Sequence, residues 1–199
     1  MSEIETMLDE RLRVRAGEAA RRIAVLAARD DLLDVAYAEE DTPVGRLLLA
    51  ATPRGIVRIA FDLEPPEQVL EDLAGRISPR VLEAPQRLDP LRRELDEYFA
   101  GRRRRFDLPL DWQLSAPGFR RHAQEALLQI PYGETRTYAQ LAAEAGSPRA
   151  VRAAGTACGM NYLPIVVPCH RIVRTGGALG GYGGGVERKE LLLELEGAR

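Results

Sequence analysis

The spacing of apolar residues changes several times along the 199-residue chain. Leucine, isoleucine and alanine recur at intervals of three or four over residues 1–33, which predicts one or two amphipathic helices. From Val35 to Phe61 the period falls to two, and Pro and Gly residues punctuate the pattern. This region predicts an antiparallel meander of three short strands, at about 35–38, 46–51 and 56–61.

Helical spacing returns after Pro65-Pro66. It predicts helices from there to about 73 and over about 88–99, 117–129, 138–145, 149–158 and 186–196. Thr137 suits the N-cap of the fourth of these helices, and Gly146-Ser147-Pro148 turns the chain into the fifth. Two helices joined by so short a turn fit a helix-turn-helix, although ordinary helical hairpins share the pattern. In the last helix, Leu191, Leu192 and Leu195 are expected to face inward.

One apolar run differs from the helices around it, because it is short and rich in β-branched residues. Residues 164–168, Pro-Ile-Val-Val-Pro, predict a short buried strand that ends at Pro168. Cys169 follows directly, and His170 and Arg171 come next. A free thiol has a pKa of about 8.5, and neighbouring cations lower it toward a reactive thiolate. A single cysteine is more often a small buried hydrophobe, so the remaining sequence must decide.

Composition narrows the class of protein. Hydrophobic residues make up 45% and charged residues 29%, values ordinary for a soluble globular protein of one or two domains. The sequence shows no secretory signal, and its longest apolar run near the N-terminus, residues 23–28, is too short to span a bilayer. We therefore expect a cytoplasmic protein with no membrane partner. Two cysteines and two histidines, not clustered with carboxylates, predict no metal site.

Charge is distributed unevenly. Residues 119–199 hold ten Lys and Arg against seven Asp and Glu, whereas residues 1–118 hold 18 against 23. Only the C-terminal part is therefore suited to meet a polyanion. The basic run at 102–105 is interpreted as a solvated loop, with a phosphate contact as the alternative.

The helix at 149–158 carries almost no side-chain bulk. Such a smooth helix can approach a nucleic-acid groove closely, or it can pack tightly against a neighbouring helix. Its small residues and its two arginines are Ala150, Ala153, Ala154, Gly155, Thr156, Ala157, Arg149 and Arg152. The glycine-rich segment 176–185 lacks the ending of a phosphate-binding loop and suits a wall where backbone lies close to a flat ligand.

With Pro168-Cys169-His170-Arg171 followed by Gly181-Tyr182-Gly183-Gly184, the sequence resembles the O6-alkylguanine-DNA alkyltransferases. The likeness runs from about residue 35 to 196. It includes Ile130-Pro131-Tyr132-Gly133-Glu134-Thr135, the helix-turn-helix, and the terminal segment from Lys189 to Glu196.

The resemblance implies two domains after a helical extension at 1–33. An α/β domain on a small antiparallel sheet, of ribonuclease H-like fold, would occupy 34–112 with its linker. A mostly helical, winged helix-turn-helix domain would occupy 113–199 and would carry both DNA binding and catalysis. The implied activity is repair of double-stranded DNA by one irreversible transfer of an alkyl group from O6-alkylguanine, and also from O4-alkylthymine, to the protein. No cofactor is implied, and the protein is expected to act as a monomer.

The resemblance also implies residue roles. Cys169 would be the alkyl acceptor, His170 its base through a water molecule, and Glu196 the group that orients the histidine. Asn161 would hold this network together, and Tyr138 would donate a hydrogen bond or proton to the departing guanine.

On the DNA side, Arg152 would fill the gap left by the flipped base, because a stacked base is out of reach of the thiol. Thr135, Arg149, Ala150, Ala153 and Gly155 would complete the DNA-binding surface. Tyr182 and Gly183 would wall the base pocket, and carbonyl groups near Cys169 and Ile172 would read the exocyclic amine.

Two departures from the family pattern bear on these roles. Tyr162 stands where the family usually has Pro after its Asn, and we expect it to affect the range of alkyl groups accepted. Ala123-Gln124 replaces the usual Val-Trp pair and puts the packing of that helix in question. Cys158 is expected to be structural.

Two other functions fit parts of the sequence. One is a lesion-binding or regulatory helix-turn-helix protein without transfer, against which the retained Cys169 argues. The other is a cysteine hydrolase that uses Cys169 and His170 directly, which is disfavoured because neighbours on an extended path point to opposite sides.

Overall fold

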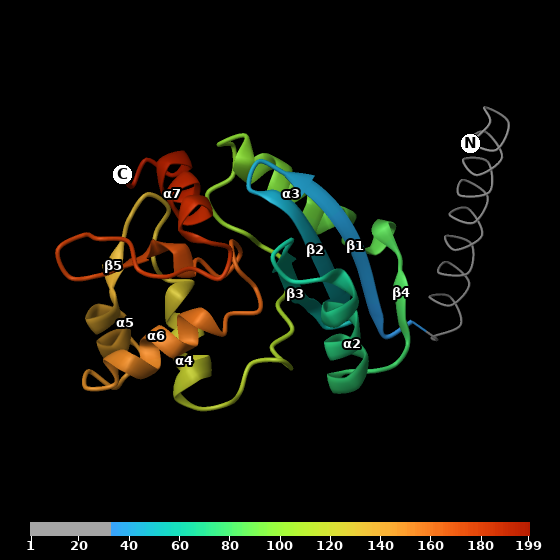
Figure 1. Ribbon diagram of the computed structural model, residues 1–199, viewed down its shortest axis with the longest axis horizontal. Helices are drawn as coiled ribbons and strands as arrows, with labels where there is room; N and C mark the ends of the chain where they lie inside the picture. Colours follow the sequence, from blue (N-terminus) through green and yellow to red (C-terminus); the bar gives the residue numbers. More distant parts are fainter. Residues whose placement is uncertain (1–32) are drawn as a thin grey trace, which may run out of the picture.

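The computed structural model describes residues 33–199, which fold into two lobes (Figure 1). The first lobe is built on a sheet whose strands are β1 (Val35–Thr42), β2 (Gly45–Thr52), β3 (Gly55–Phe61) and β4 (Val81–Glu83). The first three strands form the predicted antiparallel meander, and β4 adds parallel to β1, which gives the order β3-β2-β1-β4. β4 has only three residues, too few to show a period, so the sequence pattern did not indicate it.

Two helices cover opposite faces of this sheet, and both were predicted. They are α2 (Pro66–Arg76) and α3 (Asp89–Phe99), the latter preceded by a 3₁₀ turn at Pro85–Leu88. Alternate residues of β2 separate the two cores, since Leu47 and Leu49 share a cluster with α3 whereas Leu48 and Ala50 share one with α2. The sheet lobe therefore has three layers.

The second lobe is mostly helical. Its helices are α4 (Phe119–Leu127), α5 (Tyr138–Glu144), α6 (Val151–Gly159) and α7 (Val186–Leu195). Thr137 forms the predicted N-cap of α5 as part of a capping box with Gln140. Strands β5 (Arg136–Thr137) and β6 (Ile172–Val173) pair in parallel beside α5, and a 3₁₀ turn at Cys169–Arg171 precedes β6.

The structure corrects two predictions. The apolar run before Cys169 is not a strand, because its residues close a tight turn in which the Val167 amide donates to the Leu163 carbonyl at 2.8 Å. In α7, Leu191 does not face inward. It is 49% exposed, and Leu193 takes the buried position, because a helical turn of 3.6 residues places 192 and 193 toward the core.

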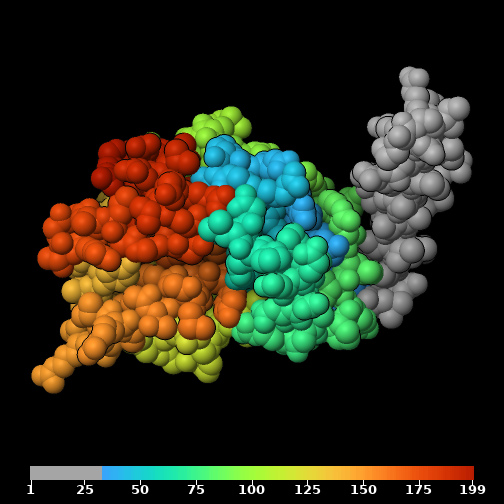
Figure 2. All heavy atoms as spheres, viewed as in Figure 1, coloured from blue at the N-terminus to red at the C-terminus, as the bar shows by residue number. Residues whose placement is uncertain are grey.

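The two lobes meet along a continuous seam, and Figure 2 shows the C-terminal segment (orange to red) directly against the first strands and α2 (blue to teal). Phe61 of β3 lies edge-on to Tyr182, and Arg188 of α7 donates to the Val44 carbonyl at 2.5 Å. The helices predicted over residues 1–33 fall outside the described residues, apart from Leu33. Among residues 33–199, no helix is both long enough and apolar enough to span a bilayer.

Candidate active site

The turn at residues 163–167, which replaces the predicted strand, leads directly to Cys169. Ile165 within it has φ of 73°, a left-handed conformation that a β-branched residue adopts only when its surroundings impose it. Its side chain is buried in the main core, which supplies that constraint. Cys169 then opens the 3₁₀ turn, with its side chain almost fully buried.

Asn161 holds the thiol from the other side of this turn. Its Nδ2 donates to Cys169 Sγ at 3.1 Å and to the Val167 carbonyl at 2.8 Å. Its Oδ1 accepts from the Leu163 amide at 3.0 Å, so all the polar groups of the side chain are engaged. Asn161 and Cys169, eight residues apart in sequence, are thus brought together as the resemblance implied.

Glu196, just after α7, collects donors from several parts of the chain. His170 Nε2 lies 2.9 Å from Glu196 Oε1, and Arg171 donates to both carboxylate oxygens at 2.8 and 2.9 Å. Burial alone would raise the pKa of Glu196, but the hydrogen bonds from His170 and Arg171 outweigh it and lower the pKa to about 2. An ionised carboxylate only accepts, so Nε2 of His170 carries the proton of the neutral ring.

The opposite ring nitrogen of His170, Nδ1, is therefore a lone-pair acceptor. It is buried and has no hydrogen-bond partner among the described residues. Burial lowers the pKa of His170 despite the neighbouring carboxylate, which keeps the ring neutral and able to take a proton.

Two residues that the sequence did not single out belong to this cluster. Tyr98, from α3 of the sheet lobe, donates its hydroxyl to Glu196 Oε1 at 2.6 Å. Lys189 of α7 is fully buried and donates to the Ile172 carbonyl at 2.5 Å. Each lies in an ordinary amphipathic helix pattern, where a core tyrosine or a surface lysine is the default interpretation. Only the tertiary fold reveals their roles.

Burial dominates the titration of the thiol. It raises the pKa of Cys169, while the hydrogen bond from Asn161 and the charge of Lys189 act in the opposite direction. Burial therefore keeps the resting thiol protonated, while Asn161 and Lys189 favour the thiolate once a base removes the proton.

A cavity of about 230 Å³ opens on Sγ at the seam between the lobes. The helical lobe contributes Asn161, Tyr162, Tyr182 and Gly183 to its wall, besides Cys158. The sheet lobe contributes residues of β3 and the following turn, namely Arg58, Ile59, Phe61 and Glu64. The pocket is thus shared by both lobes, which the sequence alone did not indicate.

Tyr138 and Ile172 are not among the residues that line this cavity. Tyr138 opens α5 and its hydroxyl packs so close to Gly180 that a Cβ there would overlap it. Burial raises the pKa of Tyr138, so its hydroxyl stays protonated and able to donate. Ile172 is buried, and its carbonyl accepts from Lys189.

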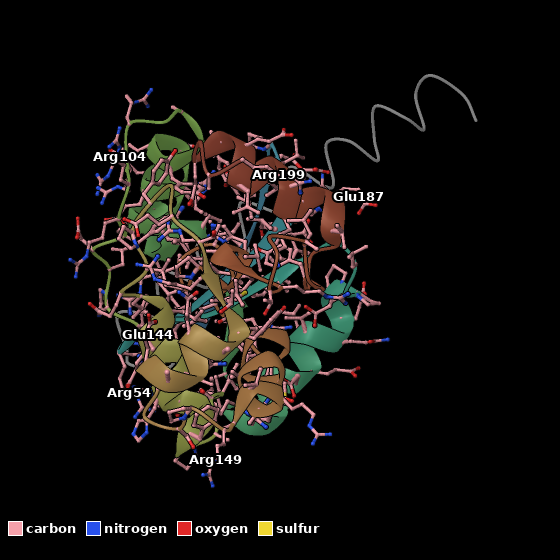
Figure 3. The ribbon with its side chains drawn as sticks, turned by 90° about the vertical axis from the view of Figure 1, so that its left-hand side faces the viewer. Arg54, Arg104, Glu144, Arg149, Glu187 and Arg199 are labelled. Carbon is pink, nitrogen blue, oxygen red and sulfur yellow. The ribbon has the colours of Figure 1, made fainter. Side chains whose placement is uncertain are left out.

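The residues predicted to bind DNA lie on α6 or just before it, except Thr135, which precedes β5. Arg149, Arg152 and Ala153 are exposed, while Thr135, Ala150 and Gly155 are half-buried. Figure 3 shows the Arg149 side chain extending away from the body of the helical lobe. Gly155 faces the Tyr138 ring, 3.9 Å from where a Cβ would stand, so the small residues serve close helix packing as well as a smooth surface.

The Ala123-Gln124 departure has a structural explanation. Gln124 is buried on α4, and its Nε2 donates to the carbonyls of Ala157 and Met160 at 3.0 Å each. It thereby caps the C-terminal end of α6, whose last carbonyls lack helical partners. The substitution leaves a well-packed helix.

Comparison with known proteins covers almost the whole described chain. A family model of the 6-O-methylguanine DNA methyltransferase ribonuclease-like domain matches residues 35–112, and one of the DNA binding domain of the same enzyme matches residues 118–198. The chain is 41% identical over 163 residues to the methylated-DNA--protein-cysteine methyltransferase of Mycobacterium tuberculosis, covering 82% of this chain and 93% of the relative. It is also 41% identical over 164 residues to the constitutive enzyme of that name in Bacillus subtilis, covering 80% and 94%.

A solved structure is similar over the same range. The crystal structure of Mycobacterium tuberculosis OGT in complex with DNA superposes with a TM-score of 0.71 at 37% identity, covering 82% of this chain and 93% of that chain. The arrangement of a small sheet lobe followed by a helical lobe is therefore common to both proteins.

Proposed function

Because the chain belongs to the methylated-DNA–protein-cysteine methyltransferase family, we propose that Cys169 is the residue that accepts the alkyl group. The protein binds DNA and repairs it by alkyl transfer. The observation that carries the residue assignment is the contact of Asn161 Nδ2 with Cys169 Sγ at 3.1 Å, in a cavity that both residues line. His170, which is paired with Glu196, follows Cys169 directly in the chain.

The arrangement supports activation of the thiol through a water molecule. His170 Nε2–H is committed to Glu196, so its free Nδ1 is the position that takes a proton. A water molecule between Nδ1 and Sγ passes the thiol proton to the ring, and the ionised Glu196 stabilises the imidazolium that forms. Glu196 itself stays ionised because Arg171 and Tyr98 keep their hydrogen bonds to it.

The transfer step is a substitution at the alkyl carbon. The Sγ–C bond forms as the C–O6 bond breaks, and the electron pair stays on O6 of guanine. A proton donated by Tyr138, and restored from the imidazolium through solvent, neutralises the leaving base. The product is a thioether, which none of these residues can hydrolyse, so each molecule reacts once.

The flipped base would stand in the cavity at the seam. Tyr182, Gly183 and Tyr162 all border that cavity. Carbonyl groups close to Cys169 would then read the exocyclic amine, whereas the Ile172 carbonyl already accepts from Lys189. O6-alkylguanine is the proposed lesion, and O4-alkylthymine presents the same alkyl–oxygen bond.

Helix α6 would approach the DNA through its exposed face. Arg152 lies on that face, next to Ala153, and its long side chain can fill the space of an extruded base. Arg149 and Thr135 would contact phosphates beside it, and the small side chains of Ala150, Ala153 and Gly155 would permit close approach. We further propose that the protein acts as a monomer and that its two domains divide at about residue 112.

Intact mass measurement tests the assignment. After incubation with an oligonucleotide that contains O6-methylguanine, the protein should gain the mass of one methyl group, and Cys169→Ala should gain none. Cys158→Ala is the matched control, since Cys158 is buried in the same cavity wall, and it should still gain one group. Mass gain in Cys169→Ala contradicts the proposal, and tight lesion binding without mass gain favours the non-transferring alternative.

A further inference from the structure

We propose that Tyr162 is a positioning residue that holds Asn161 against the sheet lobe. It thereby fixes the side chain that donates a hydrogen bond to Cys169 Sγ. The inference rests on the proposed function, in which Asn161 serves the acceptor cysteine. It assigns a second role in the reaction to the sheet lobe, which already supplies the Tyr98 hydroxyl to Glu196.

The Tyr162 ring lies against two cations of the sheet lobe. The guanidinium carbon of Arg58, on β3, is 4.8 Å from the ring centroid, and that of Arg76, at the end of α2, is 5.0 Å from it. Two like charges share one ring because each is neutralised by a carboxylate, Arg58 by Glu64 and Arg76 by Asp72. The ring quadrupole attracts a guanidinium group, and the attraction is stronger where water is excluded.

Hydrogen bonds fix the same residue at both ends. Arg76 Nη1 donates to the Tyr162 hydroxyl at 2.9 Å, and the Ile59 amide of β3 donates to the Tyr162 carbonyl at 2.8 Å. Ring, hydroxyl and backbone are thus all held by the sheet lobe. Together these contacts fix the position of Tyr162 relative to β3 and α2.

This position is transmitted to Asn161 through one peptide bond. Asn161 is only half-buried, and its side chain faces the cavity that also reaches Tyr162 and Cys169. A loop residue beside a cavity can shift without a steric clash, so its placement depends on its neighbours. Because a displacement of about 1 Å is enough to slow an oriented reaction, release of Tyr162 would weaken the Asn161–Sγ contact.

The remaining polar groups around the thiol do not depend on Tyr162. Lys189 belongs to α7, Tyr138 to α5, Cys158 to α6, and Tyr182 to the glycine-rich loop, while His170 follows Cys169 itself. Tyr162 itself lines the cavity beside Cys169, so the same measurements on Asn161→Ala show whether a change in thiol behaviour passes through Asn161.

Single-turnover kinetics of the full chain with an O6-methylguanine duplex test the proposal. Tyr162→Leu should lower the transfer rate at saturating DNA by roughly tenfold, because it removes the ring and the hydroxyl that hold the loop. The Asn161 hydrogen bond lowers the pKa of the thiol. The pH–rate profile of the variant should therefore be shifted to higher pH than the wild-type profile. DNA affinity should stay within about twofold, because the substitution leaves the exposed face of α6 unchanged.

Two companion variants separate positioning from loss of packing. Tyr162→Phe keeps the ring against both arginines and should restore most of the rate. Tyr37→Leu truncates another half-buried tyrosine of the same apolar cluster, on β1, and should leave both the rate and its pH profile unchanged. The proposal is overturned if Tyr162→Leu behaves like Tyr37→Leu while Asn161→Ala slows transfer and shifts the profile.

Failure of the proposed function gives a different pattern. In that case Asn161→Ala and Cys169→Ala leave mass gain and rate unaltered, whatever Tyr162 does. If Tyr162→Leu does not fold, Arg76→Gln provides the test from the end of α2, because it removes one of the two cations against the ring and the donor to the hydroxyl. An unchanged rate and pH profile in a folded Arg76→Gln protein would overturn the proposal equally.

Discussion

The hydroxyl of Tyr98 donates a 2.6 Å hydrogen bond to Glu196 Oε1, the same oxygen that faces His170 Nε2. Tyr98 belongs to α3 of the sheet lobe and is fully buried, whereas Glu196 follows the last helix of the helical lobe. Burial, followed by the charge of Glu196, raises the pKa of Tyr98, so its hydroxyl remains a donor throughout the working pH range. The carboxylate that orients the histidine is therefore itself oriented from the other lobe.

Tyr98→Phe should weaken both the fold and the reaction. A hydrogen bond to a buried charged group contributes about 1.5–3 kcal/mol, and its loss leaves Glu196 with one donor fewer. We expect the free energy of unfolding in urea to fall by about 2 kcal/mol and the single-turnover rate to fall several-fold. Tyr37→Phe, on the opposite face of the sheet, is the control and should change neither quantity. A Tyr98→Phe protein as stable as wild type would show that Glu196 is held sufficiently by Arg171.

The predictable part of this protein is local. Some features depend only on a few neighbouring residues, and these could be located from the sequence. They are the alternating pattern of β1 to β3, the N-cap of α5 at Thr137, and the glycine turn after α5. The run before Cys169 was assigned wrongly because β-branched residues favour strands, whereas tertiary packing holds Ile165 at φ of 73°. The family motif identified Cys169, His170, Asn161 and Glu196 as candidates.

What the sequence could not indicate is contact between distant segments. Tyr98 and Glu196 are 98 residues apart, and Arg58 reaches Tyr162 from another lobe. Nothing in the periodicity of α3 distinguishes Tyr98 from its apolar neighbours, because its ring does pack in the core and only its hydroxyl serves the site. The same holds for Lys189, whose burial follows from the loop that covers it.

Stability should fall in acid through two groups of the site. The pKa of Glu196 is about 2 in the folded protein against an ordinary 4.5, so its contribution is complete above 4.5 and is lost as the pH falls toward 2. The pKa of His170 is lowered from its ordinary 6.5, so the unfolded chain takes up a proton first as the pH falls below 6.5, which also favours unfolding. The Glu196 part alone amounts to about 3 kcal/mol.

Urea unfolding as a function of pH measures this dependence. Glu196→Gln should lower stability at neutral pH and flatten the decline below about pH 4.5. Glu190→Gln, on the surface of the same helix, is the matched control and should keep the wild-type pH dependence. If both variants follow the wild-type curve, the acid sensitivity lies outside the relay.

Gly180 and Gly181 offer a test of Tyr138. A Cβ at Gly180 would overlap the Tyr138 hydroxyl, whereas a Cβ at Gly181 meets nothing within 4 Å. Gly180→Ala must therefore displace the hydroxyl and should slow transfer tenfold or more, since a positioned general acid contributes about 10²–10⁴-fold. Gly181→Ala alters the same loop without this clash and should react at the wild-type rate. Equal rates for the two variants would argue against a role for the Tyr138 hydroxyl.

Arg152 and Arg149 should affect different steps. If Arg152 fills the space of the extruded base, Arg152→Ala should slow transfer from a duplex by about tenfold or more, since base flipping costs a few kcal/mol. The same variant should react normally with O6-benzylguanine as a free base, which needs no flipping. Arg149→Ala should instead weaken duplex binding uniformly and reduce the salt dependence of log Kd by about one, as for loss of one phosphate contact. Rates with the duplex and the free base, measured beside Kd at several salt concentrations, separate the two roles. An Arg152→Ala protein slowed equally on both substrates would place the defect in the thiol chemistry, and α6 would then act on the DNA without entering the stack.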